Sequence, residues 1–208
     1  MKITKMLRRR GHIYEVRFDD DTYINVDVTL AQEKNLNEGD FISEEDSFAL
    51  EDESEQLRCN NRALFYLSKS DKSEKGLYDK LVKAGFGPRF AKKSVERMKE
   101  LSYIDDDSYA HRLFKKCCEQ GLSNKMCVKK LCEAGISYAE TKEICLYDSA
   151  LEQEKIKKLI VKKYSSKVTD KEDIRKTAAS LGRRGFVFSD IRAVLKEYDE
   201  TIGEQNNE

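Results

Sequence analysis

In Leu81-Val-Lys-Ala-Gly85-Phe86, Leu131-Cys-Glu-Ala-Gly135-Ile136 and Leu181-Gly-Arg-Arg-Gly185-Phe186, a leucine, a glycine and a large apolar residue recur in one register, 50 residues apart. An internal repeat at a fixed period is the sequence signature of a protein built by stacking similar units. A glycine after a leucine ends many helices, but three copies in register are hard to obtain by chance. We therefore interpret the chain as three tandem copies of one structural unit.

Each copy of the pattern has the form of a helix end. A glycine at the first position past a helix takes a left-handed conformation at little cost, because it has no Cβ atom. In the Schellman motif the residue after that glycine packs against the residue four positions before the glycine. The pattern therefore predicts three contacts: Leu81 with Phe86, Leu131 with Ile136, and Leu181 with Phe186.

Apolar spacing and capping residues divide each repeat into three helices. The predicted helices are 53–68, 74–84 and 88–101 in the first repeat; 107–119, 123–134 and 137 onward in the second; and 150–164, 169–184 and 189–198 in the third. Ser73 caps the second helix, and Pro88 opens the third helix of its repeat. Capping boxes are predicted at Ser137 with Glu140 and at Thr169 with Glu172. Corresponding apolar positions are Leu64, Phe114 and Tyr164, and Val95, Cys145 and Leu195.

The first 40 residues have a different pattern. Tyr14, Val16 and Phe18 alternate with polar residues, Asp19–Asp21 supplies a turn, and alternation resumes through Ile24, Val26 and Val28, which predicts a β-hairpin. Residues 2–7 are candidates for a third strand. Thr29 with Gln32 predicts a capped short helix. The acidic residues 51–55 suit either a linker or the start of a helix, and we favour the helix, because carboxylates stabilise a helix N-terminus.

The predicted fold is therefore mostly α: three tandem three-helix repeats with a period of 50, forming an elongated curved array behind a small β-hairpin unit. The expected domains are 1–42 (β-rich unit), 43–102 (linker helix and first repeat), 103–148 (second repeat), 149–199 (third repeat) and 200–208 (acidic disordered tail).

The net charge of zero conceals an uneven distribution of charge. Residues 1–60 hold 8 Lys and Arg against 15 Asp and Glu, residues 61–196 hold 31 against 19, and residues 197–208 hold 5 acids. A basic middle segment favours an acidic or polyanionic partner. An alternative stays open, in which these lysines only solvate long helices.

The sequence has no apolar run typical of a membrane span or a secretory signal, so a cytoplasmic protein is expected.

The residue types of most catalytic and metal sites are scarce. The repeat register places Cys117, Cys127, Cys132 and Cys145 where the first repeat has aliphatic residues, which predicts small hydrophobic side chains in a reducing compartment. No Cys-x-x-Cys occurs, and His12 and His111 have no ligand spacing to the cysteines. The acidic triplets 19–21 and 105–107 lack the pattern of a calcium loop. We expect no enzyme, no metal and no cofactor.

The basic residues of the repeats are the candidate partner-binding residues. They are Lys80, Lys83, Arg89, Lys92, Lys93, Lys115, Lys116, Lys129, Lys130, Arg183 and Arg184. A three-helix unit is also the form of a helix-turn-helix module, whose third helix reads the DNA major groove. Glu140 and Asp190 at the starts of two third helices disfavour that use, because they would face phosphates or base edges. Loose contact with DNA phosphates stays open.

The same residues carry a family resemblance. They are Ala63-Leu-Phe-Tyr-Leu67, Ser73, Leu77, Leu81, Gly85-Phe86, Tyr103-Ile-Asp-Asp106, Tyr109-Ala110, Gly121, Leu131 and Gly135-Ile136. Together they resemble the RecX family, regulators of the RecA recombinase, over about residues 61–198. The β unit is similar to an N-terminal extension of some members. The third repeat departs most from the pattern, with Gly182 inside its second helix and Thr177 where Leu77 stands.

The resemblance implies a non-catalytic protein, expected to be a monomer, that lodges in the groove of the RecA–DNA filament. There it would hinder strand exchange, ATP turnover and RecA-stimulated repressor cleavage, or it would favour disassembly of the filament. The alternative is a nucleic-acid-binding module of helix-turn-helix-like repeats with no recombinase partner. We expect the basic residues of the first two repeats to carry the interaction.

Overall fold

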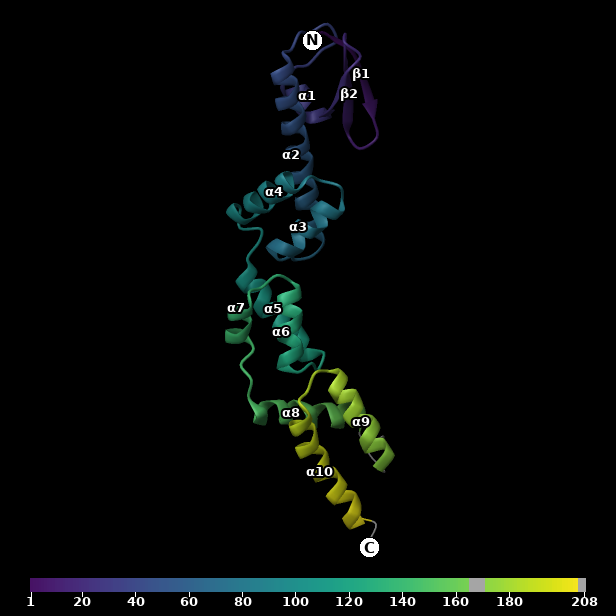
Figure 1. Cartoon of the computed structure of the whole chain (residues 1–208), viewed down its shortest axis with the longest axis vertical. Helices are drawn as coiled ribbons and strands as arrows, with labels where there is room; N and C mark the ends of the chain where they lie inside the picture. Colours follow the sequence, from purple (N-terminus) through teal and green to yellow (C-terminus); the bar gives the residue numbers. More distant parts are fainter. Residues whose placement is uncertain (165–170, 206–208) are drawn as a thin grey trace. The chain divides into compact units, whose positions relative to one another are not determined.

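The chain forms two compact units, Met1–Asp105 and Asp106–Glu208, and is mostly helical with one small sheet (Figure 1). The computed structural model describes residues 1–164 and 171–205. Within that part of the chain, no helix is long and apolar enough to cross a membrane. The predicted fold class, helical repeats behind a small β unit, is confirmed within each unit.

Three antiparallel strands form the N-terminal sheet, in the order β1-β2-β3: β1 (Ile3–Arg9), β2 (Ile13–Phe18) and β3 (Tyr23–Asp27). The predicted alternation holds, because Val16, Phe18, Ile24 and Val26 are all buried on one face. The chain turns between β2 and β3 at the predicted acidic triplet, where Asp21 has a left-handed φ of 64°.

The short helix α1 (Val28–Glu33) follows the sheet directly. Its N-cap is Asp27, whose carboxylate accepts a hydrogen bond from Thr29 N at 2.8 Å. The predicted cap at Thr29 is therefore wrong by two residues. Asp27 is the last residue of β3 and ends the strand already positioned to cap, so Thr29 falls inside the helix.

Helix α2 (Glu44–Lys69) belongs to both parts of the first unit (Figure 1). Its first half packs Leu50 and Leu57 on the sheet, and its second half packs Cys59 and Ala63 on the first repeat. The acidic residues 51–55 lie inside it, as favoured. The predicted core residue Leu64 is 39% exposed. It lies about 100° around the helix from Ala63, which takes the core position instead.

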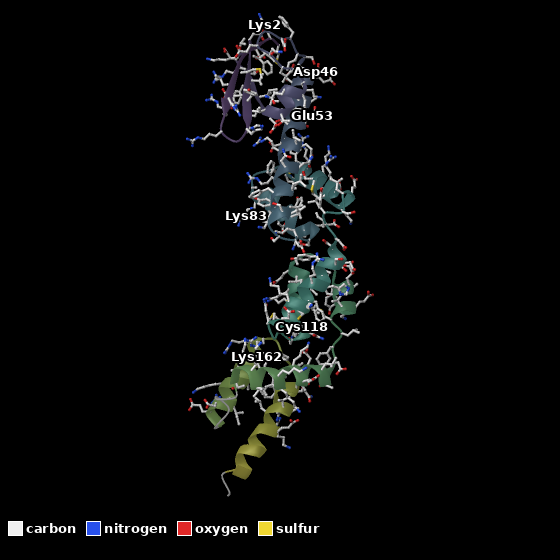
Figure 2. All side chains as sticks on the ribbon, turned by 180° about the vertical axis from the view of Figure 1, so that it is seen from behind. Lys2, Asp46, Glu53, Lys83, Cys118 and Lys162 are labelled. Carbon is white, nitrogen blue, oxygen red and sulfur yellow. The ribbon has the colours of Figure 1, made fainter. Side chains whose placement is uncertain are left out.

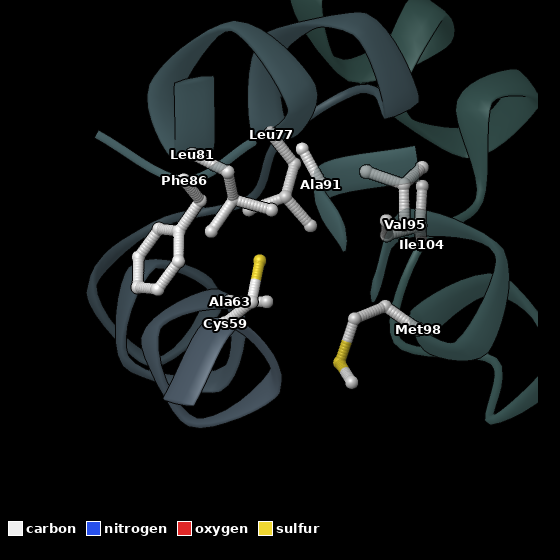
Figure 3. Close-up of a cluster of buried hydrophobic side chains, with 9 residues drawn as sticks. All are labelled: Cys59, Ala63, Leu77, Leu81, Phe86, Ala91, Val95, Met98 and Ile104. Carbon is white, nitrogen blue, oxygen red and sulfur yellow. The ribbon is translucent and has the colours of Figure 1, made fainter. Parts of the chain in front are cut away.

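The first repeat is completed by α3 (Glu74–Lys83) and α4 (Pro88–Glu100). Ser73 caps α3 through its Oγ atom, and Pro88 is the first residue of α4, as predicted. Figure 3 shows how Leu77, Leu81 and Phe86 face Cys59 and Ala63 of α2 across the core of this repeat.

The second unit contains the other two repeats. The second repeat consists of α5 (Asp106–Glu119), α6 (Asn124–Glu133) and α7 (Tyr138–Ile144). The third consists of α8 (Ser149–Leu159), α9 (Lys171–Arg183) and α10 (Phe188–Gln205). A π-helical turn, Ile160–Tyr164, extends α8 to the predicted end of that helix. Helix α10 includes most of the segment predicted as a tail. The predicted cap Thr169 and the side chain of Tyr164 lie outside the described residues.

All three repeats end their second helix in the predicted Schellman motif. Gly85, Gly135 and Gly185 have φ values of 98°, 99° and 88°. The bond from the residue after each glycine to the repeat leucine is present in every copy: Phe86 N to Leu81 O at 3.3 Å, Ile136 N to Leu131 O at 3.1 Å, and Phe186 N to Leu181 O at 3.4 Å. Each leucine is fully buried, so the repeat pattern fixes both the chain reversal and the centre of each core.

The second and third repeats have separate hydrophobic cores. Cys117, Cys127 and Cys145 are buried in the core of the second repeat, and Val95 and Leu195 occupy the positions that correspond to Cys145. Burial raises the pKa of the Cys127 thiol, and it raises the pKa of Cys145 to about 11. These thiols stay protonated at neutral pH and pack as small apolar groups.

Candidate partner-binding surfaces

The predicted basic residues of the first repeat are all exposed, but they are not equally free. Arg89 forms an ion pair with Asp52 of α2 and stacks 4.4 Å from the Phe90 ring centre. Lys92 lies 3.9 Å from Glu96, a weak pair one helical turn away. Lys83 projects from the end of α3 (Figure 2). The predicted set therefore mixes residues held inside the unit with residues that face solvent.

Lys93 lines a shallow pocket of about 430 Å³ between α2 and α4. Arg97 and Asp52 line the same pocket, so its charge is mixed. At its wall, Gln56 donates to Ser94 Oγ at 2.9 Å, which ties α2 to α4. We therefore interpret this pocket as part of the packing contact between α2 and α4, not as a binding site.

Lys80 belongs to a cluster that the sequence analysis missed. Its ammonium lies 5.3 Å from the ring centre of Tyr66, and Arg62 lies 5.8 Å from Phe65 and 5.9 Å from Tyr66. Lys69 lies 5.4 Å from the Phe65 ring. We call Arg62, Phe65, Tyr66, Lys69 and Lys80 the basic-aromatic patch. Its signal in the sequence is the spacing 62, 65, 66 and 69, which places four of its members on one face of α2.

In the second repeat, the predicted residues lie on two neighbouring helices. Lys115 and Lys116 are exposed on α5. On α6, Lys129 is 3.9 Å from Glu133, and Lys130 contacts Gln120 Oε1 at 3.5 Å. These pairs are long and solvent-exposed, so they contribute little to stability, and all four lysines stay available to a partner.

Arg184, a predicted partner-binding residue, is half-buried and bonded within the chain. Its guanidinium donates to Gln120 O at 2.8 Å and to Gly121 O at 3.4 Å, at the end of α5. Its own carbonyl accepts from Ser123 N at 3.1 Å. Arg184 therefore joins the third repeat to the second, while its neighbour Arg183 is exposed. Local sequence patterns do not predict this contact, because its partners lie more than 60 residues away in the chain.

Two buried carboxylates hold the same pair of repeats in place. Glu152 of α8 is 1% exposed and accepts from the backbone N of Asn124 at 3.2 Å and from Lys155 at 2.8 Å. Asp190 is 2% exposed and accepts from Tyr147 at 2.8 Å and from Ser149 at 2.6 Å. The bond to Asp190 raises the pKa of Tyr147.

The burial of Asp190 removes one of the two reasons given against a helix-turn-helix module. Asp190 was expected at the surface, where it would face phosphates or base edges, but it is turned inward onto α8. Glu140 does lie at the surface and forms the predicted capping box with Ser137, a contact that lowers the pKa of the Glu140 carboxyl.

A groove of about 920 Å³ lies between the second and third repeats, bounded by α6, α7 and the end of α9. Met126, Val128 and Phe186 contribute apolar surface, and three lysines line it as well. Within the described residues, no group of three or more His, Cys, Asp or Glu side chains is arranged to hold a metal ion.

Two models of one protein family match the chain. The model described as RecX, first three-helix domain, matches residues 59–98, and the model described as RecX, third three-helix domain, matches residues 151–195. The two matched segments lie within the first and third repeats, so the first and third family domains follow the order of the repeats along the chain. The chain belongs to the RecX family. Its resemblance to RecX, carried by the repeat motifs, is thus confirmed.

Full-length relatives carry the same family name. Regulatory protein RecX of Clostridium tetani (strain Massachusetts / E88) is 25% identical over 203 residues, which are 95% of this chain and 92% of the relative. Regulatory protein RecX of Streptococcus pneumoniae (strain Hungary19A-6) is 25% identical over 211 residues, covering 100% of this chain and 81% of the relative. The likeness to RecX therefore includes the β unit as well as the repeats.

Solved RecX structures have the same fold. A crystal structure of regulatory protein RecX aligns with a TM-score of 0.62 at 21% identity, over 94% of this chain and 98% of that chain. RecX from Lactobacillus salivarius aligns with a TM-score of 0.58 at 23% identity, over 70% of this chain and 97% of that chain.

Proposed function

We propose that this chain is a non-catalytic cytoplasmic regulator that binds in the groove of the RecA–DNA filament and mostly inhibits the recombinase, ATPase and coprotease activities of RecA. The observation that carries the proposal is the match of two RecX repeat domains in order, together with relatives named regulatory protein RecX. Repeats joined in one chain suit a filament, because linked weak contacts gain from effective concentration.

Lysines of the first two repeats are the proposed contacts, and all of them are exposed except the half-buried Lys130. Lys92 and Lys93 on α4, and Lys129 and Lys130 on α6, form pairs whose intramolecular contacts are long. A partner carboxylate or phosphate can replace those contacts at little cost. The proposed partners are acidic RecA surfaces and the phosphates of filament DNA.

The test is inhibition of the ATPase of RecA filaments and of strand exchange by charge-reversal variants. Lys92→Glu/Lys93→Glu and Lys129→Glu/Lys130→Glu are each expected to weaken inhibition at least tenfold. Arg8→Glu/Arg10→Glu, which makes the same charge change at exposed positions at the end of β1 and the turn after it, is the matched control. Full inhibition by both lysine variants would contradict the assignment of these residues. No inhibition by the unaltered chain would contradict the proposed function.

A second function, nucleic-acid binding without a recombinase, is favoured by the basic-aromatic patch. Rings flanked by cations suit single-stranded nucleic acid, because bases stack on the rings while the cations meet phosphates. Phe65 is 49% exposed, so a base has access to its ring.

Direct binding to bare single-stranded DNA tests this alternative. Phe65→Ala is expected to lower affinity at least fivefold if bases stack there, because stacking on an aromatic ring contributes about 1–3 kcal/mol per base. Phe48→Ala is the matched control, since Phe48 is 61% exposed on the same helix but outside the patch. Equal affinities for the two variants would exclude this surface as the DNA site.

A further inference from the structure

The groove between the second and third repeats combines an apolar floor with a rim of one charge sign. Its floor includes Met126, Val128 and Phe186, and its rim includes Lys125, Lys129 and Lys142. Among the residues that the structure describes, no acidic side chain lines it. Its volume, about 920 Å³, falls in the range of pockets that hold a specific ligand, about 300–1,000 Å³. Of the lysines proposed above as contacts, only Lys129 lines this groove, so its apolar surface has no part in the proposed function.

Hydrogen bonds within the second repeat, and between it and the third, fix the segments that line the groove. Asn124, at the start of α6, donates its side-chain amide to Leu146 O, and Ser123 N donates to Arg184 O at 3.1 Å. On the opposite side, Tyr147 is tied to the buried Asp190 at 2.8 Å. A ligand therefore meets a preformed surface, and binding requires little ordering of the protein.

The rim lysines are poorly neutralised from within the chain. Within the described residues, the one ion pair of Lys129 is its 3.9 Å contact with Glu133, and Lys142 lies 4.8 Å from the ring centre of Tyr138. Lys125 is exposed and has no ion pair within residues 1–164 and 171–205. Three cations around an apolar surface complement a ligand that carries carboxylates beside apolar side chains.

Large apolar side chains beside the lysines of the groove are strongly exposed. Leu146 is 72% exposed, Tyr138 is 61% exposed and Tyr147 is 57% exposed. Grouped around one hollow, such side chains mark an interaction site more often than isolated surface residues do. Flexible Met126 on the floor suits a partner side chain of irregular shape.

We propose that this groove binds an acidic amphipathic segment of a protein partner, helical or helix-forming, with its apolar side chains on the floor and its carboxylates on Lys125, Lys129 and Lys142. An apolar helix face inserted into a groove is a common mode of peptide recognition, with anchors at helical spacing. The inference goes beyond the proposed function, because it adds an apolar docking site to the exposed lysine pairs and does not require the partner to be RecA.

The probes are three synthetic, fluorescein-labelled 15-residue peptides, titrated with the full-length chain by fluorescence anisotropy. The first has leucines at helical spacing flanked by glutamates, the second replaces the glutamates by glutamine, and the third replaces the leucines by serine. The first is expected to bind at least tenfold more tightly than either of the others. No binding of the first peptide at protein concentrations up to about 1 mM, which excludes even a millimolar Kd, would overturn the proposal.

Groove variants locate the site. Lys125→Glu/Lys142→Glu and, separately, Leu146→Ser are each expected to weaken binding of the first peptide at least fivefold. Leu146 contributes only its carbonyl to the fold contact with Asn124, so its side chain is removable without loss of that bond. Lys115→Glu/Lys116→Glu on α5, outside the groove, is the matched control and is expected to change binding less than twofold. Circular dichroism checks that each variant is folded.

Three other outcomes would overturn the proposal. The first is equal loss of peptide binding in the α5 control, which would indicate a general charge effect. The second is concentration-dependent self-association in sedimentation velocity that the groove variants abolish, which would assign the groove to a second copy. The third is loss of bare-DNA binding in Leu146→Ser, which would assign it to nucleic acid. A failure of the first peptide to bind would not contradict the proposed function, because inhibition of RecA by the unaltered chain is measured in a separate assay.

Discussion

Single residues with special backbone or charge environments fix the local geometry of this chain. The repeat glycines share one conformation but not one environment. A Cβ atom at Gly85 would meet nothing within 4 Å, whereas one at Gly185 would lie 2.6 Å from Ser123 Oγ and 3.1 Å from Met126 Cβ. The third copy of the motif is therefore also a contact point between two repeats.

These two glycines give a matched pair of substitutions. Gly85→Ala is expected to cost about 1–2 kcal/mol, the strain of a left-handed non-glycine residue. Gly185→Ala carries the same strain and a steric clash, so it is expected to cost more. Urea unfolding followed by circular dichroism gives the loss, and hydrogen exchange assigns it to a repeat. A smaller loss at Gly185 than at Gly85 would contradict the close approach of α6.

The ionisation of Glu15 is coupled to the fold through two ion pairs on the sheet. Hydrogen bonds from Arg9 at 2.8 Å and Arg17 at 2.8 Å lower the pKa of its carboxyl to about 2. A carboxyl with a lowered pKa stabilises the folded state fully above its unfolded value, near 4.5, and that contribution is lost as the pH falls toward 2.

The resulting prediction concerns the pH dependence of stability. Glu15→Gln is expected to lower the urea midpoint at pH 6, and the difference from the unaltered chain is expected to shrink steadily between pH 4.5 and 2.5. Glu100→Gln, at the exposed end of α4, is the control and should show no such trend. A difference that grows on acidification would have the wrong sign and would exclude this coupling.

At the scale of elements, buried polar contacts connect helices that the repeat pattern treats as separate. Glu152 of α8 accepts from the free N–H of Asn124 at the start of α6, and Lys155 balances its charge at 2.8 Å. A helix N-terminus favours a carboxylate, since its first N–H groups have no partner within the helix. The Glu152 carboxylate therefore caps the N-terminus of α6, although Glu152 belongs to another helix.

Removal of this carboxylate tests the contact between repeats. Glu152→Ala is expected to destabilise the second unit by about 2 kcal/mol or more, because the buried N–H of Asn124 loses its acceptor and the half-buried Lys155 loses its counter-charge. Lys155 keeps its bond to Asn124 Oδ1 at 2.6 Å. Glu154→Ala, two residues away in an exposed pair with Lys158, is the control and should cost about 0.5 kcal/mol or less. Equal losses in urea unfolding would contradict the structural role of Glu152.

At the scale of the whole molecule, the elongated curved arrangement of the repeats stays a prediction from the period of 50. A compact globule of 208 residues would have a radius of gyration of about 17 Å. Small-angle X-ray scattering of the monomer is expected to give a clearly larger value. A radius of gyration near 17 Å would contradict an extended array, without affecting the fold of either unit.

The sequence by itself determined the repeat period, the helix ends and the buried leucines, because Schellman caps and capping boxes depend on residues within one turn of each other. Leu81, Leu131 and Leu181 were predictable for this reason. Leu64 was not, since α2 must serve two cores and the choice between adjacent positions depends on what packs against them. Only the tertiary structure placed Arg184 on α5, turned Asp190 inward and formed the groove. These features join helices distant along the chain, and no local spacing records which side chains meet across such a contact.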